Sequence, residues 1–114
     1  MGLFLQAVFT AQGFTMDLAT DGNAGLEMAR RRRPDLVILD LLMPYKNGFE
    51  VLAELKESPE TRSVPIIILS SNSREEDIVK ALNAGADDFV VKPFRARELV
   101  TRVRKLLERV RETP

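Results

Sequence analysis

The sequence predicts an α/β fold in which helices cover both faces of a parallel sheet. Two uninterrupted aliphatic runs, Leu36-Val37-Ile38-Leu39 and Ile66-Ile67-Ile68-Leu69, have the composition of strands that are buried on both faces. Stretches with helical spacing of apolar residues separate and flank these runs, as crossover helices require. The 114 residues are enough for one domain over 1–114 and too few for two.

The first part of the chain shows two helical stretches and one short alternating stretch. Leu3 to Ala11 has apolar residues at helical spacing, and Gly13 follows where a helix C-cap belongs. Thr15 to Ala19 alternates polar and apolar residues, which predicts an exposed edge strand. A second helix is predicted from Ala24 to Arg32.

The second part repeats the unit of strand and helix. The first aliphatic strand ends at Asp40, and the second ends at Ser70. Phe89 to Val91 is the predicted last strand. Three amphipathic helices separate and follow these strands, with predicted apolar faces at Phe49, Val51, Leu52 and Leu55, at Ile78, Val79 and Leu82, and at Leu99, Val103, Leu106 and Val110.

Composition excludes several classes of site. The chain has no cysteine and no histidine, which removes thiolate chemistry, classical triads and ordinary zinc sites. Lys+Arg and Asp+Glu balance at 17 each, so the total charge does not favour nucleic acid or an anionic membrane as partner. No apolar run approaches the roughly 20 residues of a membrane helix, and we expect a cytoplasmic protein.

Three polar residues are predicted at the carboxyl ends of successive parallel strands, namely Asp40, Ser70 and Lys92. In open α/β sheets this edge is where ligands bind. A carboxylate there can accept a phosphoryl group, a hydroxyl can hydrogen-bond the new phosphate oxygens, and an ammonium can neutralise their charge. Each residue alone is explained as well by an ordinary structural position, but the three together indicate a phosphoryl site.

Several runs resemble, in order, the receiver domain of two-component response regulators. They are Pro34-Asp35-Leu36-Val37-Ile38-Leu39-Asp40-Leu41-Leu42-Met43-Pro44, Asn47-Gly48-Phe49-Glu50, Val64-Pro65-Ile66-Ile67-Ile68-Leu69-Ser70, Ala84-Gly85-Ala86-Asp87-Asp88-Phe89 and Lys92-Pro93-Phe94. By this resemblance Asp40 is the phosphoacceptor, Ser70 the switch hydroxyl, Phe89 the aromatic coupled to it, and Lys92 the site lysine. The Leu42 carbonyl is the implied backbone ligand of magnesium, and Lys92-Pro93 the implied cis peptide.

The same resemblance implies a flavodoxin-like sheet with the strand order 2-1-3-4-5, whose first strand ends in an acidic pair that holds magnesium. Leu3 to Ala11 matches the family's first helix, so we expect an N-terminally truncated fold of four strands and about five helices. With Asp40 as the only predicted carboxylate ligand, magnesium binding is expected to be weak or absent, and phosphorylation is in doubt.

A missing central strand leaves the Leu36 to Leu39 strand with unpaired backbone groups, and two rearrangements are predicted as alternatives. In the first, the Thr15 to Ala19 strand moves beside Leu36 to Leu39 and brings Asp21 to the site as a substitute metal ligand. In the second, two chains cover the edge together as an intertwined dimer.

The resemblance also implies partners. We expect a signalling protein that is not an enzyme, with a sensor histidine kinase or another signalling protein as partner and no direct contact to nucleic acid or membrane. Six charged residues resemble the salt-bridging pattern of the family's dimer interface, and the resemblance implies such an interface here: Lys80, Asp87, Asp88, Glu98, Arg102 and Arg104. The alternative is a phosphorylation-independent pseudo-receiver that acts as an interaction or dimerisation module.

Overall fold

The computed structural model describes residues 2–41, 47–71 and 74–112, and this part of the chain forms a three-stranded parallel sheet with five helices. The order is α1 (Gly2–Ala11), α2 (Gly22–Arg32), β1 (Val37–Asp40), α3 (Gly48–Glu57), β2 (Ile66–Ser70), α4 (Glu75–Asn83), β3 (Asp88–Val91) and α5 (Ala96–Glu112). The strands lie in the order β1-β2-β3, with Asp40 opposite Leu69 and Ser70 opposite Val91.

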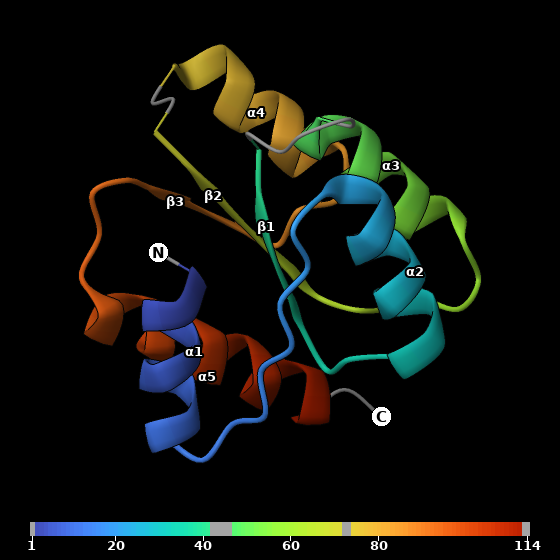
Figure 1. Ribbon diagram of the computed structural model, residues 1–114. Helices are drawn as coiled ribbons and strands as arrows, with labels where there is room; N and C mark the ends of the chain where they lie inside the picture. Colours follow the sequence, from blue (N-terminus) through green and yellow to red (C-terminus); the bar gives the residue numbers. More distant parts are fainter. Residues whose placement is uncertain (1, 42–46, 72–73, 113–114) are drawn as a thin grey trace.

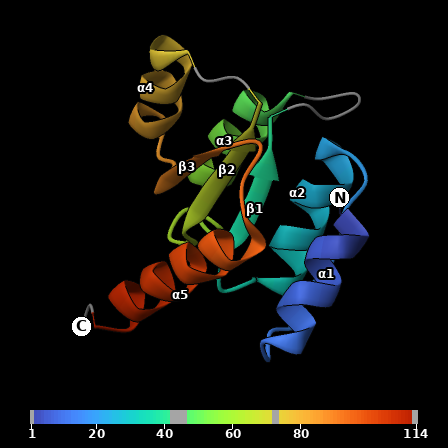
Figure 2. The same cartoon turned by 90° about the vertical axis from the view of Figure 1, so that its left-hand side faces the viewer.

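The central strand β2 separates two apolar cores. Ile66 and Ile68 point into a cluster with buried residues of α2, α3 and α4, whereas Ile67 and Leu69 point into a cluster with α1 and α5. Figures 1 and 2 show α1 and α5 together on one side of the sheet and α2 and α3 on the other. The predicted doubly wound fold is therefore confirmed, because a strand buried on both faces needs helices on both.

The ends of α1 and α2 follow local rules. Gly13 has φ +91 just after α1, as predicted for a helix C-cap. The Asp21 side chain caps α2 by accepting a hydrogen bond of 2.8 Å from the N–H of Ala24. Arg33 ends α2 in the left-handed conformation, with φ 46, and its N–H donates to the carbonyl of Ala29.

The predicted strand at Thr15 to Ala19 is wrong. These residues form no strand, and β1 has β2 as its sole sheet neighbour within the described ranges, so the first rearrangement is also wrong. The alternation has another cause, since Met16 packs against the core of α1 and α5 while Asp17 is exposed and pairs with Arg32. The Met16 carbonyl accepts a hydrogen bond from the Gln6 side chain rather than from a strand. Three strands, not four, result in the described part of the chain.

The predicted apolar face of α4 is also wrong in part. Ala81 is completely buried and Ile78 half-buried, but Val79 and Leu82 are 45% and 43% exposed. Helix α4 packs against β3 at the border of the sheet, so a narrower stripe of it is covered than on a central helix. The exposed pair therefore belongs to the surface.

Candidate functional site

Asp40 and Lys92 meet at the carboxyl edge of the sheet. Asp40 is the last residue of β1, and Lys92 follows directly after β3. Nζ of Lys92 lies 2.5 Å from Oδ2 of Asp40, and the two side chains are 25% and 28% exposed. Since β2 lies between the two strands, the lysine reaches across its end. The structure thus brings together two groups that are 52 positions apart in the sequence.

Ser70 ends the strand between them. It is almost completely buried, with 2% exposure. Its carbonyl accepts a hydrogen bond of 2.8 Å from the N–H of Lys92, and the N–H of Leu41 donates to the carbonyl of Leu69 at 3.2 Å. The sheet pairing therefore continues past the strand ends and fixes the three predicted site residues relative to one another. The Lys92-Pro93 peptide bond is cis, as the resemblance implied.

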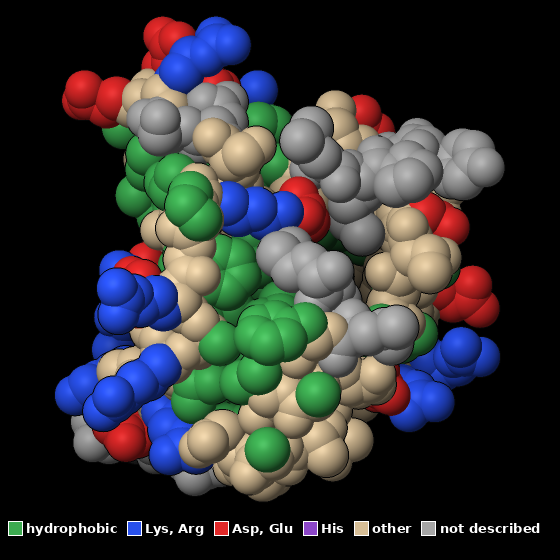
Figure 3. Space-filling view, turned by 60° about the vertical axis from the view of Figure 1, so that its left-hand side comes forward, with side chains coloured by type: hydrophobic (Ala, Val, Ile, Leu, Met, Phe, Trp, Pro, Cys, Tyr) green, Lys and Arg blue, Asp and Glu red, His purple; other side chains and the backbone are tan. Residues whose placement is uncertain are grey.

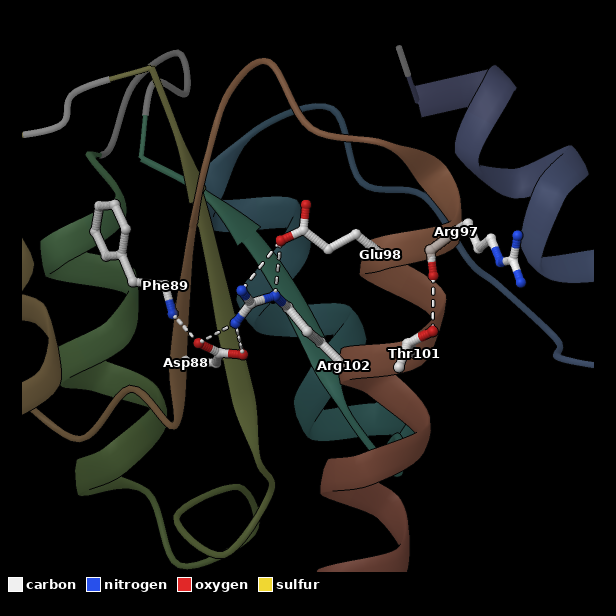
Figure 4. A network of polar contacts seen from close by, with 6 residues as sticks. All are labelled: Asp88, Phe89, Arg97, Glu98, Thr101 and Arg102. Carbon is white, nitrogen blue, oxygen red and sulfur yellow. Dashed lines mark hydrogen bonds and ion pairs between the residues drawn. The ribbon is translucent and has the colours of Figure 1, made fainter.

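Phe89 lies in β3 opposite Ile68, three residues before Lys92. It is half-buried and packs against the core beneath α3 and α4. Figure 4 shows its ring directed away from Arg102, on the other side of the strand from the Asp88 side chain. Its role as the aromatic coupled to Ser70 remains a prediction.

The predicted magnesium ligands are not assembled by the described residues. The Asp21 carboxylate caps α2, Asp40 is paired with Lys92, and Leu42 lies outside the described residues. Over 2–41, 47–71 and 74–112, no three acidic side chains lie close enough together to hold a metal ion. This donor set does not fit a hard divalent cation, which needs several oxygen ligands.

Three of the six predicted interface residues form one network on β3 and α5 (Figure 4). The guanidinium of Arg102 donates to both carboxylate oxygens of Asp88, at 3.1 and 2.9 Å, and to Oε2 of Glu98, at 3.2 and 3.0 Å. Hydrogen bonds from Arg102 to Asp88 and then to Glu98 raise its pKa above the ordinary value. Arg102 is therefore a fixed positive charge held between two carboxylates.

Lys80 lies on α4 and contacts α3. Its Nζ sits 4.3 Å from the centre of the Phe49 ring, a cation–π contact that joins α4 to α3. The exposed Val79 and Leu82 are on the same helix. Sequence reasoning missed the pair, because apolar spacing alone assigned both residues to the core. The small side chain of Ala81 was the feature of the sequence that could have indicated which side of α4 is buried.

The other two predicted interface residues are engaged elsewhere. The Asp87 carboxylate accepts a hydrogen bond of 2.8 Å from the N–H of Ile66, at the start of β2. Arg104 donates to the carbonyl and side-chain oxygens of Gln12, at 3.2 and 3.0 Å, and lies over the Phe14 ring. The structure therefore places Arg104 on the α1 side of α5, apart from the Asp88 network.

Hydrophobic and basic side chains occupy different parts of the surface. Figure 3 shows hydrophobic side chains gathered in the middle of one face and several Lys and Arg side chains along one border. Helix α5, the longest helix described, contains Arg97, Arg102, Arg104, Lys105 and Arg109. Neither α5 nor any other helix in the described ranges is long and apolar enough to cross a membrane.

The parallel sheet, its two helical layers and a paired aspartate and lysine at the carboxyl edge define a receiver-type α/β domain. The sequence matches the family described as the response regulator receiver domain over residues 3–104. The chain therefore belongs to this family.

Curated relatives include the response regulator ArlR of Staphylococcus epidermidis, 41% identical over 106 residues, and the phosphate regulon regulatory protein PhoB of Rhizobium meliloti, 38% identical over 111 residues. These alignments cover 93% and 97% of this chain and 47% and 49% of the relatives. The chain thus spans about half the length of the curated relatives it matches.

Solved structures of receiver domains are similar throughout the chain. The receiver domain of the Francisella response regulator 1452 is 31% identical with a TM-score of 0.88, covering 95% of this chain and 88% of that one. The receiver domain of a signal transduction histidine kinase from Syntrophus aciditrophicus is 33% identical with a TM-score of 0.88, covering 99% and 86%. The receiver domain of the sensor histidine kinase PA1611 of Pseudomonas aeruginosa, with a magnesium ion in its active site cleft, is 30% identical with a TM-score of 0.80, covering 95% and 85%.

Proposed function

We propose that this chain is a two-component signalling receiver, rather than an enzyme, which accepts a phosphoryl group on Asp40. The observation that carries the proposal is the contact between Lys92 Nζ and Asp40 Oδ2 at the carboxyl edge of a parallel sheet. A sensor histidine kinase or another cytoplasmic signalling protein is the proposed donor. Ser70 and Phe89 are the proposed residues that respond to the new charge.

The chemistry uses the two residues in contact. A carboxylate oxygen of Asp40 attacks phosphorus and forms a P–O bond, while the bond from phosphorus to the donor breaks and its electron pair leaves with the donor. The Asp40 carboxylate loses its negative charge on forming the P–O bond, and Lys92 then pairs with a phosphoryl oxygen instead. In this proposal the Ser70 hydroxyl, at the end of β2, donates to another oxygen of the phosphoryl group. The carboxylates in the described part of the chain do not form a magnesium site.

The test is to treat the chain with acetyl phosphate, with and without magnesium, and to compare it with Asp40→Asn by intact mass. The parent is expected to gain one phosphoryl group and the variant none. Beryllofluoride should shift the NMR signals of the Phe89 region in the parent alone. If parent and variant behave identically in both measurements, Asp40 is not a phosphoacceptor.

A phosphorylation-independent interaction module is the second candidate, and the exposed apolar pair Val79 and Leu82 favours it. These side chains lie on α4, and the network of Asp88, Glu98 and Arg102 lies on β3 and α5. We propose this α4-β3-α5 surface as the face that binds a second copy. Val79→Asp combined with Leu82→Asp is expected to reduce self-association in sedimentation equilibrium without lowering secondary structure content.

The predicted intertwined dimer would cover a different region, the free edge of β1. β1 pairs with β2 alone within the described ranges, and its sequence carries no lysine or proline that would block pairing. Light scattering at high protein concentration tests this dimer together with the α4 variants. A dimer that survives Val79→Asp and Leu82→Asp supports the β1 edge, and a monomeric parent contradicts both interfaces.

A further inference from the structure

The first turn of α3 lies directly against the backbone that carries Asp40. The N–H of Gly48 donates to the carbonyl of Leu41 at 3.1 Å. A Cβ atom on Gly48 would stand 2.6 Å from Cα of Leu41, 2.7 Å from its Cδ2 and 3.1 Å from the carbonyl oxygen of Asp40. Two of these separations are shorter than real Cβ atoms show, and one is to the backbone. Position 48 therefore accepts no side chain unless β1 and α3 move apart.

The turn that bears Gly48 is itself fixed. Asn47 caps α3 by accepting a hydrogen bond of 3.0 Å from the N–H of Glu50, and its amide donates to Oε1 of Glu50 at 2.9 Å. This reciprocal pairing resembles a capping box with asparagine at the cap position. Gly48, and Val51 three residues later, are both buried. A capped and buried turn cannot yield easily, so an added side chain would displace the strand end instead.

We propose that Gly48 is a positioning residue for Asp40: the close approach of α3 to the Asp40-Leu41 backbone holds the carboxylate in contact with Lys92. This role rests on the proposed function of Asp40 as phosphoacceptor. The side chain of Lys92 comes from the far side of β2, so a small shift of the β1 end opens the Asp40 to Lys92 contact. The glycine acts through the backbone and does not touch the reacting atoms.

The test uses the reactivity of the Lys92 amine, which does not depend on phosphorylation. The parent and Gly48→Ala are treated with a trace of an amine-acetylating reagent, and labelling of Lys92 is followed by peptide mass spectrometry with the exposed Lys105 as internal reference. Lys92 should label about two- to fivefold faster in the variant, the range expected when an ion pair of this kind is lost. The affinity for beryllofluoride should fall by about tenfold or more, because small misplacements are costly in such sites.

Val103→Ala is the matched control. Val103 is buried on α5 in the core that does not include α3, so its truncation lowers stability without adding an atom between Gly48 and Leu41. It is expected to leave Lys92 labelling at the parental rate. If Gly48→Ala also leaves this rate unchanged relative to Lys105, Gly48 is a packing residue and the positioning role is wrong.

A second variant covers the case in which Gly48→Ala does not fold. Asn47→Ala removes the cap but adds no atom, so α3 loosens its hold on the strand end, and Lys92 should again label faster, by a smaller factor. Unchanged labelling in Asn47→Ala overturns the proposal. Should the parent fail to bind beryllofluoride, the proposed function is contradicted, while the labelling comparison still decides whether Gly48 positions Asp40.

Discussion

Gly85→Ala is expected to destabilise the domain through two separate effects. Gly85 lies between α4 and β3 with φ +114, a conformation that side chains strongly disfavour, and this alone costs about 1–2 kcal/mol. An added Cβ would also stand 2.9 Å from Cγ of Lys56 and 3.1 Å from its Cε. The Lys56 side chain is not free to move, because its Nζ donates to the carbonyls of Arg62 and Val64 at 3.3 and 3.2 Å.

Displacing Lys56 should weaken those two hydrogen bonds, which close the segment between α3 and β2, at a cost of about 1 kcal/mol in total for partly exposed groups. The sum is a loss of about 2–3 kcal/mol in the free energy of unfolding, or a urea midpoint lowered by roughly 1–2 M. Urea denaturation followed by far-UV circular dichroism measures it.

Two comparisons separate the effects. In a Lys56→Ala background the steric part disappears, so Gly85→Ala should cost only the backbone strain of about 1–2 kcal/mol. Gly25→Ala is the helical control, since its Cβ would make an ordinary contact of 3.6 Å with Ala19, and it is expected to stabilise by about 0.5–1 kcal/mol. A loss below about 0.5 kcal/mol for Gly85→Ala, or a loss that does not depend on Lys56, would refute the reasoning.

Three further changes are testable by the same denaturation assay. Arg33→Gly should stabilise by about 0.5–1 kcal/mol, because the left-handed backbone at φ 46 is strained for arginine and free for glycine. Thr61→Val should cost about 1–2 kcal/mol, since the hydroxyl of Thr61, which is 1% exposed, donates to the carbonyl of Leu55 at 2.7 Å and valine leaves that carbonyl unpaired. Arg102→Ala should cost at most about 1 kcal/mol at low salt and less at high salt, because its ion pair with Asp88 is partly exposed; a loss that does not depend on salt would contradict an electrostatic origin.

The parts of the fold that were predictable have local signatures. An aliphatic run such as Ile66 to Leu69 identifies a strand buried on both faces without knowledge of its neighbours. Once parallel pairing is assumed, residues that end successive strands must lie at one edge, so the meeting of Asp40 with Lys92 could be predicted across 52 positions.

The incorrect predictions depend on contacts distant in sequence. The alternation at Thr15 to Ala19 is compatible with a strand, but a strand also needs a hydrogen-bonded neighbour, which the alternation does not supply. Apolar spacing on α4 indicates an amphipathic helix, yet how wide a stripe is covered depends on where the helix lies on the sheet, and Val79 and Leu82 remain exposed. The need for glycine at position 48 is likewise invisible locally, because it comes from the close approach of Leu41, which directly follows β1.

Strand β3 connects the proposed phosphoryl site to the proposed interface. Lys92 follows the strand directly, and successive side chains of a strand alternate, so Phe89 packs beneath α3 and α4 while Asp88 binds Arg102 of α5. A phosphoryl group on Asp40 would give Lys92 a new partner and thereby shift the end of β3. The Phe89 and Asp88 contacts lie on the two faces of that strand. Because Arg102 remains charged throughout the physiological pH range, we expect any response of this network to follow from geometry and not from a change in its protonation. Beryllofluoride-induced shifts at Phe89 and Asp88 that disappear in Lys92→Met, with the fold intact, are the expected result; shifts that persist would place the connection elsewhere.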